Sequence, residues 1–132
     1  MIKRVPLRLL CAVVLTATRA HLRCFGLRRS ISLSRRITSR SVTNHSDPVS
    51  AGASAALAVA QVAALFPGRA RCLEQSLTLF VVLRWLGVPA QFRLGAQALP
   101  FVAHAWVEVS GQPINGESDV LVQVQPFPEF TE

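Results

Sequence analysis

The segment from Ala53 to Phe66 has no charged residue and is built almost entirely of alanine and larger apolar residues. Good helix formers dominate it, and Pro67-Gly68 ends a helix there. A helix that is apolar on nearly every face must be covered, so we expect a central core helix. The chain has 132 residues, 51% of them hydrophobic, which suits one domain around such a helix.

The residues after this helix show first a helical and then a strand pattern. Cys72 to Leu86 has a broad apolar face and is followed by Gly87-Val88-Pro89, which predicts a second helix with a firm stop. Gln91 to Gly95 and Phe101 to Val109 alternate as strands do. In the longer strand, His104, Trp106 and Glu108 share one side.

A hairpin completes the predicted sheet. Ser110-Gly111 predicts a two-residue turn into a strand over 112–115, and residues 120–124 predict another short strand. Residues 42–51, with Asn, Ser, Asp and Pro, predict a linker or turn. The order of elements predicts an α+β fold with N-terminal helices packed on one face of a small antiparallel sheet.

Charge divides the chain. Ten of its fourteen Lys and Arg lie between Lys3 and Arg40, and no acidic residue precedes Asp47. We therefore predict a basic helical arm over 1–46 and a near-neutral domain over 47–132. A basic arm suits an acidic partner, a membrane surface or nucleic acid, or is simply solvated. Phe25 is its only aromatic residue, which argues against nucleic acid.

The start of the arm partly resembles a targeting signal. An apolar run from Leu9 to Ala17 follows a basic start, but Arg19 stands where small residues should mark cleavage. Helical spacing of Leu7, Leu10 and Val14 favours a folded or docking helix over export. Residues 24–40 suggest a second amphipathic helix or a docking arm. No stretch approaches about 18 unbroken apolar residues, so no membrane span is expected.

Cys72 and His104 are the candidate catalytic pair. Cys72 stands at the start of a predicted helix, where unpaired N–H groups and the helix dipole stabilise a thiolate. A downstream histidine on a strand is the usual partner, taking the thiol proton and later protonating the leaving amine. A third group should orient the imidazole. Asn115, Glu117 and Asp119 follow at a suitable distance along the chain.

These residues carry a family resemblance. Cys72-Leu73-Glu74-Gln75-Ser76-Leu77, Gly87-Val88-Pro89, Pro100-Phe101 and His104-Ala105-Trp106-Val107-Glu108-Val109 resemble the leader peptidases of lasso-peptide biosynthesis, the transglutaminase-like microcin-processing proteins. The resemblance implies a transglutaminase-like (papain-like) core with Cys72 as nucleophile and His104 as general base. The implied reaction is hydrolysis of one peptide bond, which removes the leader from a ribosomally made precursor. It implies no cofactor and no metal.

One position departs from the family pattern. The acidic residue expected twelve positions after the histidine is replaced by Gly116. Asn115 could orient His104 instead, as in a Cys-His-Asn arrangement, or Glu117 could do so if the hairpin is bulged by one residue. The departure also leaves open a catalytically weak scaffold. A transglutaminase-like acyl transferase, with an amine in place of water, is the other alternative.

The resemblance also implies partners. The segment before the linker is too short and too basic to resemble the family's leader-recognition domain, so a separate leader-recognition protein is expected. The precursor peptide and a lasso cyclase complete the expected set. Three cysteines without disulfide or metal-site spacing suggest a reducing, cytoplasmic setting.

Overall fold

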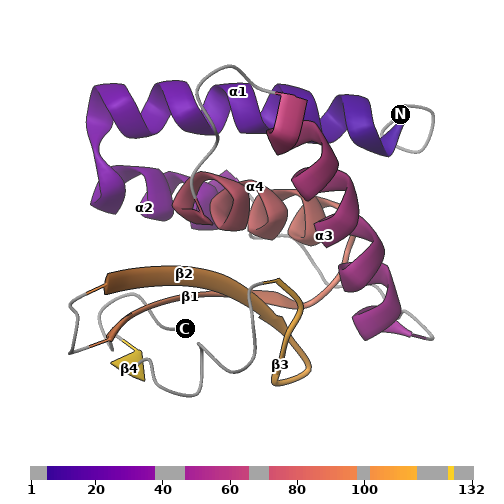
Figure 1. Cartoon of the computed structure of the whole chain (residues 1–132). Coiled ribbons are helices and arrows are strands. Elements are labelled where there is room, and N and C mark those ends of the chain that lie inside the picture. Colours follow the sequence, from indigo (N-terminus) through magenta and orange to yellow (C-terminus); the bar gives the residue numbers. More distant parts are fainter. Residues whose placement is uncertain (1–5, 38–46, 66–71, 98–101, 116–124, 127–132) are drawn as a thin grey trace.

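The computed structural model describes residues 6–37, 47–65, 72–97, 102–115 and 125–126. Four helices come first: α1 (Leu7–Phe25), α2 (Leu27–Ile37), α3 (Pro48–Leu65) and α4 (Cys72–Trp85). Four strands follow: β1 (Ala90–Gln97), β2 (Val102–Val109), β3 (Gln112–Pro113) and β4 (Gln125–Pro126). The helices lie together on one face of the sheet (Figure 1). The predicted α+β class, with helices on one face of an antiparallel sheet, is confirmed.

The sheet has the strand order β3-β2-β1-β4, and all its pairs are antiparallel. The turn between β2 and β3 is the predicted one: Ser110 and Gly111 both have positive φ, at 53° and 78°. β3 is shorter than predicted and ends at Pro113, which cannot donate to the ladder. The strand predicted over 120–124 falls outside the described residues, and β4 is found at Gln125–Pro126 instead.

Helix α4 lies between α1 and the sheet, while α3 also contacts β2 directly (Figure 1). Its residues from Ser76 to Leu83 are buried, so it is the centre of the core. Gly87 ends it in the left-handed conformation, φ 85°, while the Val88 N–H bonds back to the Leu83 carbonyl. On β2, Val107 and Val109 face the helices and are fully buried. The packing of α4 against β1 and β2 fixes the position of the start of α4 on the sheet.

Helix α3 begins earlier than the sequence pattern predicts. Asp47 caps it by accepting a hydrogen bond from the Ser50 N–H at 3.1 Å, and Pro48 occupies the first helical position. The expectation of a linker through Ala51 is therefore wrong from Asp47 onward. The first part of that expected linker lies outside the described residues.

By length and composition, α3 could cross a membrane, and it is the one described helix that could. Its 18-residue window has a mean hydropathy of 1.5, and 33% of that window is buried. Alanine, valine and leucine keep the mean hydropathy high, although Ser50, Ser54 and Gln61 interrupt the apolar run. The expectation that the chain has no membrane span therefore stays a prediction. A core helix passes the same test, and α3 packs against α1 and α4 through buried Ala55 and Val59.

The basic N-terminal helices belong to the same packed layer. Cys11 and Leu15 of α1 are fully buried and lie in one cluster with residues of α3 and α4. The expected amphipathic helix is therefore present as α1, and it runs on to Phe25. Residues of the second basic stretch form α2, after a break at Gly26 with φ 84°. The division of the chain at residue 46 stays a prediction, although the described core is continuous across it.

Candidate active site

Cys72 is the first residue of α4, as predicted. A helix start presents backbone N–H groups that have no partner within the helix, and the helix dipole adds positive potential there. The structure describes the backbone of Cys72 and of His104 but not their side chains. Arg69 and Arg71, which would add to the field, lie outside the described residues. The position thus suits a thiolate, while the role of Cys72 stays a prediction.

His104 lies on β2, where it is paired with Gly95 of β1. Gly95 is also paired with Pro126 of β4, so it stands in the middle of three strands. A glycine offers no side chain to its neighbours, and a glycine inside a strand often marks a close approach. Gly95 was expected in a strand but in no functional role, although a glycine paired with a candidate catalytic histidine is a usable signal.

The start of α4 is joined directly to the His104 region of β2. Ser76, one turn after Cys72, donates a hydrogen bond from its Oγ to the carbonyl of Ala105 at 2.9 Å. Ser76 is fully buried. The bond links a residue four positions after the candidate nucleophile to the residue next to the candidate base. The structure therefore brings together the two chain segments that carry the predicted pair.

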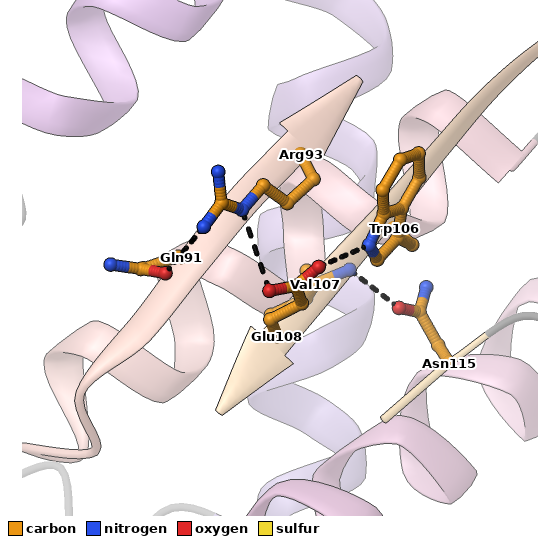
Figure 2. Close-up of polar contacts among 6 residues, drawn as sticks. All are labelled: Gln91, Arg93, Trp106, Val107, Glu108 and Asn115. Atoms are coloured by element: carbon orange, nitrogen blue, oxygen red, sulfur yellow. Dashed lines mark hydrogen bonds and ion pairs between the residues drawn. The ribbon is translucent and has the colours of Figure 1, made fainter. Parts of the chain in front are cut away.

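Asn115 lies at the same junction. Its Oδ1 accepts a hydrogen bond from the Val107 N–H at 2.7 Å (Figure 2). Its Nδ2 donates to the Oγ of Ser76 at 2.9 Å. One side-chain amide therefore ties the end of the hairpin to β2 and to α4. The other candidates for the third role, Glu117 and Asp119, lie outside the described residues, as does Gly116, so which residue orients His104 stays a prediction.

A pocket opens beside this junction. It has a volume of about 470 Å³ and lies between α3, α4, β2 and the end of the hairpin. Gln75 of α4, Ala105 of β2 and Asn115 each contribute to its wall. On the α3 side the wall consists mainly of Ala53, Ala56, Leu57 and Ala60. Small apolar side chains around a few amide groups suit a peptide better than a charged small molecule.

A polar network occupies the other face of the sheet (Figure 2). Trp106 donates from Nε1 to Glu108 Oε2 at 2.8 Å, and Arg93 Nε lies 3.5 Å from Glu108 Oε1. Arg93 also donates to Gln91 Oε1 at 3.1 Å. Trp106 and Glu108 were expected on one side of their strand, but the contribution of Arg93 and Gln91 was not foreseen. The available signal was that Gln91 and Arg93, two residues apart on the neighbouring strand, lie on one face of the sheet.

Two other cysteines differ in exposure. Cys11 is buried in α1, and burial raises the pKa of its thiol from 9.0 to about 11. Cys24 is exposed near the end of α1. Cys11 is thus a poor nucleophile at neutral pH. Within the described part of the chain, no group of three or more His, Cys, Asp or Glu residues could hold a metal ion.

Helices packed on one face of an antiparallel sheet, with the helix that starts at Cys72 joined to the strand that carries His104, fit an α+β papain-like fold. The model of the transglutaminase-like superfamily matches residues 4–128, and the chain belongs to this superfamily. Cysteine peptidases and acyl transferases are its general types. No curated protein and no solved structure gave a match. The matched region includes both basic helices.

Proposed function

We propose that this protein is a cytoplasmic cysteine peptidase that removes the leader from a ribosomally made lasso-peptide precursor. A separate leader-recognition protein would present the precursor, and a lasso cyclase would close the freed core peptide. The proposal combines the superfamily membership with the resemblance of the Cys72 and His104 segments to leader peptidases. The observation that carries it is the Ser76–Ala105 hydrogen bond, which holds these two segments together.

The mechanism follows from the roles of the two residues. The Cys72 thiolate attacks the carbonyl carbon of the scissile bond, and the helix N–H groups stabilise negative charge at this end of α4. The imidazolium of His104 gives its proton to the leaving amine, which leaves an acyl group on sulfur. His104 then takes a proton from water, and the resulting attack releases the leader and restores the thiolate.

The same acyl group could pass to an amine, which is the acyl transferase alternative. The two reactions share every step up to the acyl-enzyme, so only the acceptor distinguishes them. Mass spectrometry of the precursor after incubation with this protein and its recognition partner separates them. A free leader acid indicates hydrolysis, and a leader amide indicates transfer.

Variants test the catalytic pair. Cys72→Ala and His104→Ala should each lower precursor cleavage by at least about 10³-fold, because the residues act as a unit. Cys24→Ser, which changes an exposed cysteine, is the matched control and should cleave normally. Equal cleavage by all four proteins would exclude this mechanism, and a normal rate for His104→Ala alone would exclude His104 as the base.

A second measurement tests contact between the two side chains. Side chains alternate along a strand, which puts position 104 on the face of β2 that carries Trp106 and Glu108 and not on the face toward α4. Contact between the Cys72 and His104 side chains is therefore the decisive part of the proposal. The rate of Cys72 alkylation by iodoacetamide should follow an apparent pKa well below that of a free thiol, and His104→Ala should raise it. An identical profile in both proteins would show that the pair is not coupled.

A further inference from the structure

Helices α1, α2 and α4 enclose an apolar groove on the part of the molecule away from the sheet. Its volume is about 230 Å³, larger than an engineered cavity of about 150 Å³ that holds a benzene molecule. Apolar residues of all three helices line it: Leu10, Val14 and Ala17 of α1, Leu33 of α2, and Leu77 and Val81 of α4. The groove therefore has room for more than one apolar side chain of an incoming segment.

Two of the helices that form this groove, α1 and α2, carry only positive charge. Residues 7–37 contain seven arginines and no acidic residue. Arg29 lies one helical turn before Leu33 on α2, and both side chains are exposed. Val13, also at the groove, is 59% exposed. An apolar groove between basic helices is complementary to a segment with an apolar face and carboxylates beside it.

A helix matches this shape better than a bilayer does. An amphipathic helix places side chains at i, i+3, i+4 and i+7 in a groove, whereas a bilayer surface is broad and cannot fill a narrow concave site. The apolar lining also argues against nucleic acid, as does the presence of a single exposed aromatic residue, Phe25, on the two basic helices. We propose that the groove formed by α1, α2 and α4 binds an acidic amphipathic helix of a protein partner.

The groove is connected to the candidate active site through α4. Leu77 and Val81 form its floor, and the same helix begins at Cys72. The Nε of Arg19 in α1 lies 3.4 Å from the Oε2 of Glu74 in the first turn of α4. A bound helix would lie along the element that carries the candidate nucleophile. The proposal itself concerns binding only and stands apart from the peptidase proposal.

Synthetic peptides test the groove directly. The probe is a fluorescein-labelled peptide of about 18 residues with leucines at helical i, i+3, i+4, i+7 spacing and glutamates elsewhere. One control has the same composition with the leucines scattered around the helix, and another has lysines in place of the glutamates. Fluorescence anisotropy with full-length Cys72→Ala protein should give at least about tenfold tighter binding of the probe than of either control.

Matched variants locate the binding site. Leu33→Glu and Ala17→Trp should each weaken probe binding at least about tenfold, because one adds a carboxylate and the other fills the groove. Leu65→Glu changes an exposed leucine at the end of α3, outside the groove, and should leave binding unchanged. Circular dichroism verifies that each variant is folded, and only folded variants are compared.

Three results would overturn the proposal. The first is equal binding of the probe and the scattered-leucine peptide. The second is an equal loss of binding in Leu33→Glu and Leu65→Glu. The third is binding to vesicles of phosphatidylglycerol and phosphatidylcholine without binding of the probe, which would assign the surface to membranes. Because the protein used lacks Cys72, none of these results depends on whether the chain is a peptidase.

Discussion

The Nδ2 of Asn115 donates a hydrogen bond to the Oγ of Ser76 at 2.9 Å, across 39 residues of sequence. The Ser76 hydroxyl donates a hydrogen bond to the Ala105 carbonyl, and the Oδ1 of Asn115 accepts one from the Val107 N–H. Three hydrogen bonds thus join one turn of α4, two peptide groups of β2 and the end of the hairpin. This set fixes where the first turn of α4 stands on the sheet.

Removing the Asn115 amide should destabilise the protein. Asn115→Ala leaves the Val107 N–H without its acceptor, and an unsatisfied buried group costs about 1–3 kcal/mol. Urea unfolding should show a loss in this range. Ser54→Ala, at an exposed position of α3, is the control and should stay within about 0.5 kcal/mol of wild type. If Asn115→Ala lost no more stability than Ser54→Ala, water would have replaced the Asn115 amide as the acceptor for the Val107 N–H.

The acceptor and the donor of Asn115 can be separated. Asn115→Asp keeps an oxygen for the Val107 N–H but loses the donor to Ser76. We therefore expect precursor cleavage by Asn115→Asp to keep its substrate affinity and to lose rate, because α4 is held less firmly against β2. The KM and kcat values measure this split. A lower affinity with an unchanged rate would place Asn115 at the substrate instead.

The Arg19–Glu74 ion pair should couple α1 to the first turn of α4. Both side chains are 15% exposed, so the pair is better shielded from solvent than a surface pair. A double-mutant cycle of Arg19→Ala and Glu74→Ala should give a coupling energy of about 1–2 kcal/mol in urea unfolding. The same cycle with Arg23→Ala in place of Arg19→Ala should give a coupling energy of about zero, because Arg23 is an exposed arginine of α1. Equal coupling energies would assign the effect to net charge.

The buried thiol of Cys11 predicts an alkaline loss of stability. The folded protein binds this proton more tightly, with a pKa of about 11 against 9.0 for an ordinary thiol. The contribution is therefore fully present below pH 9 and is lost as the pH rises to 11, because only the unfolded chain ionises there. Urea unfolding at pH 8, 9.5 and 10.5 should show a steeper decline for wild type than for Cys11→Ala. Parallel declines would contradict the assignment.

Gly52 marks a close approach between α3 and the hairpin. A Cβ added there would lie 2.8 Å from Ile114 Cδ1 and 3.3 Å from Val109 Cγ2. Gly52→Ala should gain helix propensity but lose packing, for a net change within about 1 kcal/mol. Adding Ile114→Val, which removes the clashing methyl, should make Gly52→Ala stabilising relative to Ile114→Val alone. Thermal unfolding of the four proteins measures this, and a destabilising effect in both backgrounds would point to Val109.

Local patterns in the sequence were sufficient for most of the fold. Apolar periodicity located α4 to within one residue, and Ser110-Gly111 identified the turn because few residues tolerate its positive φ. The start of α3 was missed although Asp47-Pro48 is a cap followed by a favoured first residue. That signal was outweighed by the turn-forming residues around it.

The candidate site was predictable as residue types and not as contacts. Cys72 and His104 could be named from helix-start chemistry and a motif, since both are local properties. The bond from Ser76 to Ala105 spans 29 residues, and nothing in either segment specifies it. Asn115 was considered only as a residue that orients histidine, and its link to α4 depends on how helix and sheet pack. Long-range pairings of this kind come from packing, which a single sequence does not reveal.

The position of α1 in the core has a consequence for synthesis. Its buried residues Cys11 and Leu15 pack against α4, which ends at Trp85. The ribosome makes about 5–20 residues per second, so several seconds separate α1 from its covering helix. During that interval the apolar face of α1 has no native partner from α4. Helix α1 is thus made well before α4 covers it, and the nascent chain should depend on chaperones or on a partner during that time.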